Sequence, residues 1–161
     1  MRRTSFEDMQ CSVAQALEVV GEWWSFLIIR DAFLGVNRFG QFQDRLGIAR
    51  NVLSARLDGL VEHGVLKRVA YQDNPVRHEY KLTEKGRDLW LSLTALREWG
   101  DRWAAPDGPP VEVVHQGCGR VTTVVPTCSS CGEVLDPFNV KAVAGPGMGQ
   151  PPMVPLAGAA S

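Results

Sequence analysis

The feature that most constrains this chain is a change in the spacing of its apolar residues partway along the sequence. Residues 38–46 carry apolar side chains at helical spacing, and after a glycine-containing turn a second helix is predicted over 50–63. Two short segments rich in strand-forming residues follow, 65–71 and 77–82, joined by the polar tip 72–76. The order of helix, tight turn, helix and hairpin predicts a winged helix-turn-helix with a β-hairpin wing, an α+β fold that is mainly helical.

Further helices are predicted on both sides of this segment. Residues 12–35 have a helical apolar period, and Gly21 is expected to divide them into two helices. Thr83 can cap a later helix. The apolar stripe of that helix consists of Leu89, Leu93, Leu96, Trp99 and Trp103. This stripe presents more apolar surface than one small domain readily covers, which predicts a homodimer. Packing of the stripe against the first helices is an alternative.

The helix over 50–63 is expected to lie in a DNA major groove and to contact the bases. If Leu53, Leu57 and Leu60 are buried, the helical period turns the opposite face outward. Arginine and asparagine can bond bidentately to purine edges, and serine and arginine can contact phosphate. The residues assigned to DNA binding are Arg38, Arg50, Asn51, Ser54, Ala55, Arg56 and the wing residue Arg77. The alternative is an ordinary solvated helix face.

Two acidic residues bear on this assignment. Asp58 is unfavourable beside phosphates, so it is expected to pair with an arginine or to contact a cytosine amino group. Arg77 could instead pair with Glu79.

The net charge of −1 does not favour nucleic acid, but residues 38–87 carry ten Lys/Arg against six Asp/Glu, and DNA binding needs only a basic face. A winged-helix protein-interaction module without operator binding therefore remains the alternative function.

The sequence resembles the HxlR-type transcriptional regulators over about residues 8–103. The matching segments are Cys11-Ser12-Val13-Ala14, Leu17, Trp24, Leu27-Ile28-Ile29-Arg30, Arg38-Phe39, Leu53-Ser54-Ala55-Arg56-Leu57, His63-Gly64-Val65 and Glu79-Tyr80-Lys81-Leu82-Thr83-Glu84-Lys85-Gly86. The resemblance implies a dimeric winged helix-turn-helix that binds double-stranded operator DNA, with its recognition helix at 50–63 and its wing at 71–77. The terminal helices would form the dimer interface. Ser12 departs from the proline that often follows the cysteine in this family.

Cys11 precedes the first predicted helix. A cysteine near a helix N-terminus can have a favoured thiolate, which is the reactive form. The resemblance implies that a cysteine placed here can sense an oxidant or electrophile. The alternative is an inert, partly buried thiol that behaves as a small hydrophobic residue.

A second cluster lies beyond the proline-rich linker that follows residue 104. His115-x2-Cys118-Gly119 and Cys128-x2-Cys131-Gly132 supply four potential ligands in two spaced pairs, the pattern of a zinc ribbon. Residues 111–140 are too few to build a sizeable core, so a structural zinc ion held by His115, Cys118, Cys128 and Cys131 is predicted. A redox dithiol at Cys128 and Cys131 is the alternative, but no βαβ setting for it is visible.

The predicted organisation is a winged helix-turn-helix domain for DNA binding and dimerisation over 8–104, a zinc-ribbon-like unit over 111–140 and a disordered tail over 142–161. No apolar run is long enough to span a membrane and no signal peptide is visible, which predicts a cytoplasmic protein. No nucleophile-base pair, phosphate loop or open metal site is apparent, so no enzymatic activity is expected. The predicted function is sequence-specific transcriptional regulation by a homodimer, with an oxidant, electrophile or small ligand as effector.

Overall fold

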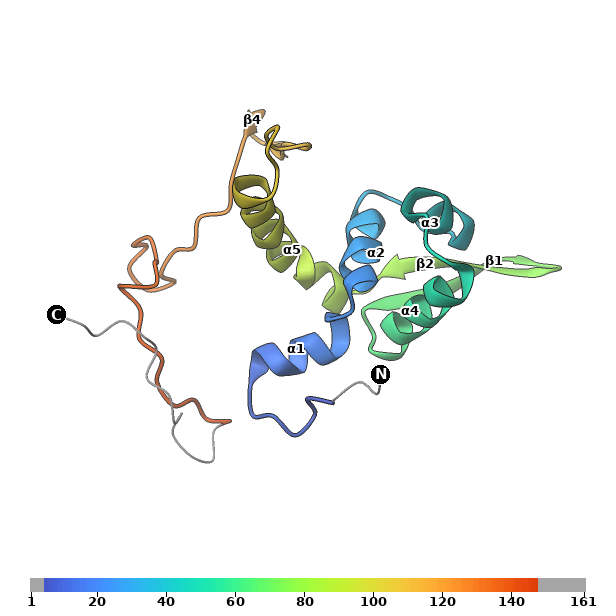
Figure 1. Cartoon of the computed structure of the whole chain (residues 1–161), viewed down its shortest axis with the longest axis horizontal. Coiled ribbons are helices and arrows are strands. Elements are labelled where there is room, and N and C mark those ends of the chain that lie inside the picture. The colour runs from blue at the N-terminus through green and yellow to red at the C-terminus, as the bar shows by residue number, and fades with distance from the viewer. Residues whose placement is uncertain (1–4, 148–161) are drawn as a thin grey trace. The chain divides into compact units, whose positions relative to one another are not determined.

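The computed structural model describes residues 5–147, and the chain divides into two compact units between Arg97 and Glu98. The elements, drawn in Figure 1, are α1 (Ser12–Val20), α2 (Trp23–Phe33), α3 (Phe39–Leu46), α4 (Arg50–Glu62), β1 (Leu66–Asp73), β2 (Val76–Leu82), α5 (Glu84–Trp103), β3 (Val114–His115) and β4 (Arg120–Val121). Residues 148–161 of the predicted disordered tail lie outside the described residues. Within residues 5–147, no helix combines the length and apolar character needed to cross a membrane.

Gly21 separates α1 from α2, as predicted. Its amide donates to the carbonyl of Leu17 at 2.8 Å and so closes the last turn of α1. A Cβ atom at this position would lie 2.3 Å from the same carbonyl oxygen. Glycine is therefore required sterically where the chain leaves α1.

The helix-turn-helix consists of α3, a turn at Gly47 and α4. Gly47 has a φ of +61°, a left-handed conformation that glycine adopts without steric cost. The side chain of Gln41 accepts from the amide of Arg38 at 3.1 Å and fixes the first turn of α3. α4 ends at its C-cap His63, and Gly64 follows in the left-handed conformation with a φ of +68°, the usual way in which a glycine terminates a helix.

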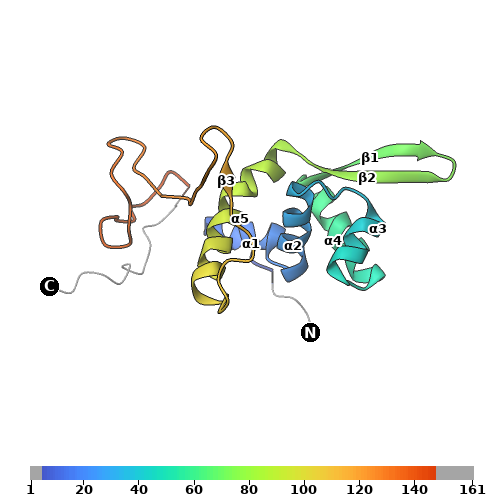
Figure 2. The same ribbon diagram turned by 90° about the horizontal axis from the view of Figure 1, so that it is seen from above.

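The wing is an antiparallel hairpin in which Leu66 pairs with Leu82 and Arg68 with Tyr80. Its strands are longer than predicted, because the pairing continues to Asp73 opposite Val76. A register shift between Ala70 and Gln72 leaves Tyr71 as one extra residue in β1, without a paired residue in β2. The expected tip therefore shrinks to two residues, and Figure 2 shows the hairpin extending beyond α3 and α4.

The core of the first unit lies among α2, α3, α4 and the start of the wing. Its fully buried side chains come from each of these elements. They are Ile28, Ile29, Phe42, Leu53, Leu57, Leu60, Val65 and Leu66. Burying one such side chain contributes about 1.5–3 kcal/mol. The same packing holds α4 with its opposite face toward solvent.

The start of α5 is tied to the end of α4. Thr83 caps α5 as predicted, because its hydroxyl accepts from the amide of Gly86 at 3.1 Å. The same hydroxyl donates to the carbonyl of Gly64 at 2.6 Å. Gly86 is buried, and a Cβ atom there would lie 2.2 Å from the carbonyl oxygen of Val65. The first turn of α5 can approach Val65, the residue before β1, this closely only because residue 86 has no side chain.

Candidate DNA-binding site

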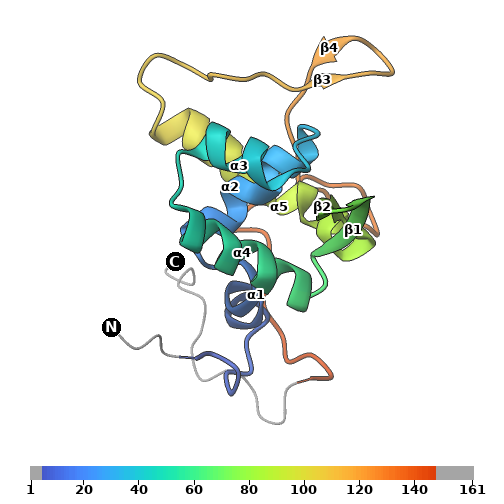
Figure 3. The same ribbon diagram turned by 90° about the vertical axis from the view of Figure 1, so that its right-hand side faces the viewer.

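The outward face of α4 carries the predicted contact residues. Asn51, Ser54 and Ala55 are exposed. Leu53 and Leu57 are fully buried on the opposite side, which confirms the predicted orientation of the helix. In Figure 3 this side of the first unit faces the viewer, with α3, α4 and the wing hairpin all visible. Polar side chains on an exposed helix of this length are able to enter a major groove.

A groove of about 430 Å³ lies between the helix-turn-helix and the wing. It brings together three of the predicted residues: Arg38, which immediately precedes α3, Arg50 of α4 and Arg77 of β2. The other lining residues are Phe39, Gly40, Gln43, Tyr71, Val76, His78 and Tyr80. Three guanidinium groups around one concavity give the basic surface that a phosphate backbone requires.

Two of these arginines rest on aromatic rings. The guanidinium carbon of Arg38 lies 4.4 Å from the ring centroid of Tyr71, and that of Arg50 lies 5.1 Å from the centroid of Phe39. Cation–π contact limits the rotamers of a long side chain without using its N–H groups. In Arg38, Nε and one terminal nitrogen donate to Glu79. Sequence reasoning did not assign Tyr71 or Phe39 to the site, because only the fold places these rings beneath the arginines.

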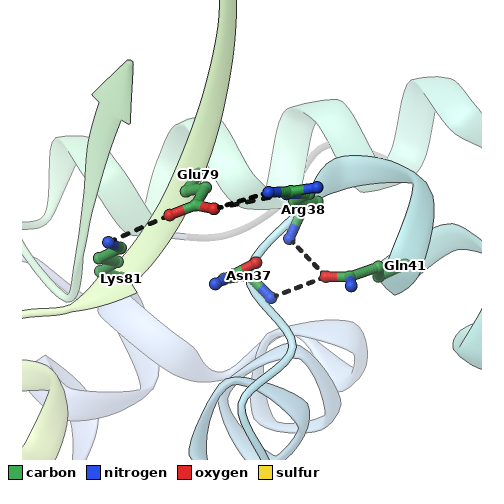
Figure 4. A network of polar contacts seen from close by, with 5 residues as sticks. All are labelled: Asn37, Arg38, Gln41, Glu79 and Lys81. Atoms are coloured by element: carbon green, nitrogen blue, oxygen red, sulfur yellow. Dashed lines mark hydrogen bonds and ion pairs between the residues drawn. The ribbon is translucent and has the colours of Figure 1, made fainter. Parts of the chain in front are cut away.

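Glu79 joins the wing to the start of α3 (Figure 4). One of its carboxylate oxygens lies 3.0 Å from Lys81 Nζ and the other lies 3.3 Å from an Arg38 nitrogen. Hydrogen bonding from Lys81, with a smaller contribution from Arg38, lowers the pKa of Glu79 below its ordinary value. The alternative pairing of Arg77 with Glu79 is therefore not found, and Arg77 forms no ion pair within residues 5–147.

Arg56 and Asp58 have partners within the protein. Arg56 lies 3.3 Å from the carboxylate of Glu22, the residue that precedes α2, and its side chain is 30% exposed. It does not line the groove. Asp58 forms an ion pair with Arg68 of β1, which confirms the expectation that an arginine would neutralise it. The acidic charge on the outer face of α4 is thus compensated.

Cys11 occupies the position that immediately precedes α1, and its side chain is exposed. Its backbone carbonyl accepts from the amide of Gln15 at 3.0 Å, the first hydrogen bond of the helix. The thiol is therefore accessible from solvent at the N-terminus of α1.

The four residues predicted to bind zinc lie in the second unit and form two pairs. His115 Nδ1 and Cys118 Sγ are 3.4 Å apart. Hydrogen bonds from the backbone of Ser130 and Cys131 lower the pKa of the Cys128 thiol. Within residues 5–147, no cluster of three or more His, Cys, Asp or Glu side chains is arranged to hold a metal ion.

A helix-turn-helix followed by a two-stranded wing, with arginines between them, defines a winged helix-turn-helix protein. The chain belongs to the HxlR-like helix-turn-helix family, whose model matches residues 19–108. A relative is the uncharacterised HTH-type transcriptional regulator Rv3095 of Mycobacterium tuberculosis, 49% identical over 137 residues, which are 84% of this chain and 87% of the relative. That alignment is longer than the first unit, which ends at Arg97, and so includes part of the second unit.

Solved structures of similar proteins give the same fold. The crystal structure of PA1607, a candidate transcription factor, is 43% identical with a TM-score of 0.74 and covers 83% of this chain and 94% of its own. The oxidised form of the redox regulator HypR is 31% identical with a TM-score of 0.53, covering 57% of this chain and 96% of its own. The second match is confined to a smaller part of the chain than the first.

Proposed function

We propose that this protein binds operator DNA as a homodimer, with α4 in the major groove and the wing beside it on the phosphate backbone. The observation that carries the proposal is the groove in which Arg38, Arg50 and Arg77 converge next to the exposed face of α4. The neutralisation of Asp58 by Arg68 removes the main electrostatic objection to this face. It also weakens the argument for a module that has lost DNA binding.

The base-reading role is assigned to Arg50 and Asn51, at the first turn of α4. Fluorescence anisotropy with the DNA upstream of the protein's own gene is the direct test. Arg50→Ala and Asn51→Ala should each weaken specific binding by about 1–3 kcal/mol, the usual cost of a lost base contact. Arg87→Ala is the matched control, because Arg87 is exposed but does not line the groove. Unchanged affinity in both α4 variants would exclude α4 as the recognition helix.

The dimer is proposed to form through α1 and α5, with a second copy of the chain as the partner. Val13 of α1 is 67% exposed, and Trp90, Leu96, Trp99 and Trp103 of α5 are 47–66% exposed. Large apolar side chains gathered on one helix favour an interface. Light scattering should give a mass of about twice the 17.7 kDa chain. A monomer at micromolar concentration would exclude the twofold arrangement.

An oxidant is the effector class that the family relationship supports, and Cys11 is the proposed sensor. Peroxide would convert its thiolate to a sulfenic acid and would itself be reduced to water. Operator affinity should then change on peroxide treatment of the unmodified protein and remain constant in Cys11→Ser. If the response persists in Cys11→Ser but is lost in Cys131→Ser, the sensor lies in the second unit instead.

A further inference from the structure

The second unit contains two copies of one small structure, separated by 13 positions. His115 and Arg120 pair within one hairpin. Their counterparts 13 residues on are Cys128 and Glu133, and the amide of Cys128 donates to the carbonyl of Glu133 at 2.8 Å. Val114 pairs with Val121, as Thr127 pairs with Val134. We name these segments the first knuckle (residues 113–122) and the second knuckle (residues 126–135).

The equivalence extends to the tight turn within each knuckle. The amide of Gly119 donates to the carbonyl of His115 at 2.8 Å, and the amide of Gly132 donates to that of Cys128 at the same distance. Both glycines are left-handed, with φ of +68° and +77°. His115 thus corresponds to Cys128, and Cys118 to Cys131. Two independent segments of backbone present a ligand-capable residue at the same two positions of the same turn.

The spacing within the first knuckle matches the edge of a metal tetrahedron. With Zn–S near 2.3 Å and Zn–N near 2.0–2.1 Å, a tetrahedral site places nitrogen and sulfur about 3.5 Å apart. The observed distance from His115 Nδ1 to Cys118 Sγ is 3.4 Å. The two atoms, which are also within hydrogen-bond distance of each other, thus have the separation expected of two ligands of one ion.

The second unit lacks the apolar core that would otherwise hold two such hairpins. Val114, Val121 and Val134 are 51–56% exposed, and Phe138 is 90% exposed. A segment of this size usually needs a metal or a disulfide to be stable, and all four cysteines of the chain are free thiols. The connection between the knuckles, residues 123–125, contains no helix or strand that would have to break if they approached each other.

We propose that the two knuckles close around one zinc ion, with His115 and Cys118 as one half of the site and Cys128 and Cys131 as the other. Each of the three thiols loses its proton to solvent, and the neutral imidazole binds through Nδ1. The result is a Zn²⁺ ion with three thiolates and a net charge of −1. Four protein ligands fill the coordination shell, so the ion stabilises the unit and leaves no position for substrate.

Metal content of the full-length protein, purified without chelator and incubated with zinc chloride, tests the proposal directly. We expect about one zinc per chain. Cobalt(II) chloride added to metal-free protein should give the visible absorption of a tetrahedral cobalt thiolate site. His115→Ala and Cys131→Ser, one from each knuckle, should weaken zinc binding by at least about tenfold, because even outer-shell changes have effects of that size.

Cys11→Ser is the matched control, since it removes a thiol outside the knuckles and should retain full zinc binding. Helix content measured by circular dichroism verifies that the first unit stays folded in each variant. The cobalt test on the unmodified protein does not depend on whether any variant folds. Absence of zinc and of the cobalt absorption in the unmodified protein would overturn the proposal, as would undiminished zinc affinity in both knuckle variants. A Cys128–Cys131 disulfide in metal-free, freshly purified protein would favour the redox dithiol instead.

Discussion

Replacing Gly86 by alanine should destabilise the first unit, although the same change in an exposed helix normally stabilises it. An alanine methyl group would lie 2.2 Å from the carbonyl oxygen of Val65, a backbone atom that no rotamer change can move. Overpacking of this kind costs about 1–3 kcal/mol. Moving α5 away would also weaken the hydrogen bond from the amide of Thr83 to Val65, worth about 1 kcal/mol. The gain in helix propensity returns about 0.5–1 kcal/mol, which leaves a net loss of about 2 kcal/mol.

Gly59→Ala is the matched control, because Gly59 lies within α4 and a Cβ atom there has no neighbour within 4 Å. It should raise the free energy of unfolding by about 0.4–1 kcal/mol. Urea denaturation at one fixed protein concentration measures both changes, and the loss in Gly86→Ala corresponds to a fall in Tm of about 8–16 °C for a domain of this size. If both variants are stabilised alike, the close approach of α5 to Val65 does not exist in solution.

Three further predictions concern charged side chains. Glu79→Gln should lower Tm at neutral pH. Because the folded-state pKa of Glu79 is lowered, the stabilising contribution of its carboxylate is present above the ordinary pKa of 4.5 and is lost as the pH falls through the folded-state pKa. The Tm curves of the variant and the unmodified protein should therefore converge in acid. Asp31 is fully buried and accepts from Arg30 Nε at 3.0 Å and from Arg45 Nε at 3.3 Å. Asp31→Asn should lower the free energy of unfolding by about 1–3 kcal/mol, and equal urea midpoints would contradict this. Arg77→Ala should reduce the salt dependence of DNA binding by about one unit of slope at all sequences, whereas an unaltered slope would remove Arg77 from the phosphate contacts.

Much of the fold could be predicted because it depends on local periodicity. The buried leucines of α4 define its inner face at 3.6 residues per turn, and the glycine at position 21 breaks the first helical segment. The length of the wing could not be predicted in this way. Gln72 and Asp73 are polar and typical of a turn, yet they pair with Arg77 and Val76 across the hairpin. Strand length here depends on pairing with the opposite strand.

The candidate site could be predicted by residue type but not by partner. Arg50 and Asn51 follow from their place on the outer face of α4. The ion pair between Arg56 and Glu22, which precedes α2, joins residues 34 positions apart and leaves no mark in the local pattern. The correspondence of the two knuckles is visible in the sequence as one shared spacing, in His115-x2-Cys118-Gly119 and Cys128-x2-Cys131-Gly132. Only the structure shows that the two turns also have the same backbone hydrogen bonds.

The bond from Thr83 to the carbonyl of Gly64 connects the end of α4, the proposed recognition helix, to the beginning of α5. In a homodimer held through α5, the separation of the two recognition helices would follow from the direction in which α5 leaves this junction. DNA presents equivalent major-groove positions about 34–36 Å apart. The geometry of this junction would therefore determine the operator half-site spacing that the dimer can bind. A substitution that changes the direction of α5 relative to α4 would therefore alter which operators the protein binds, without changing a base-contacting residue.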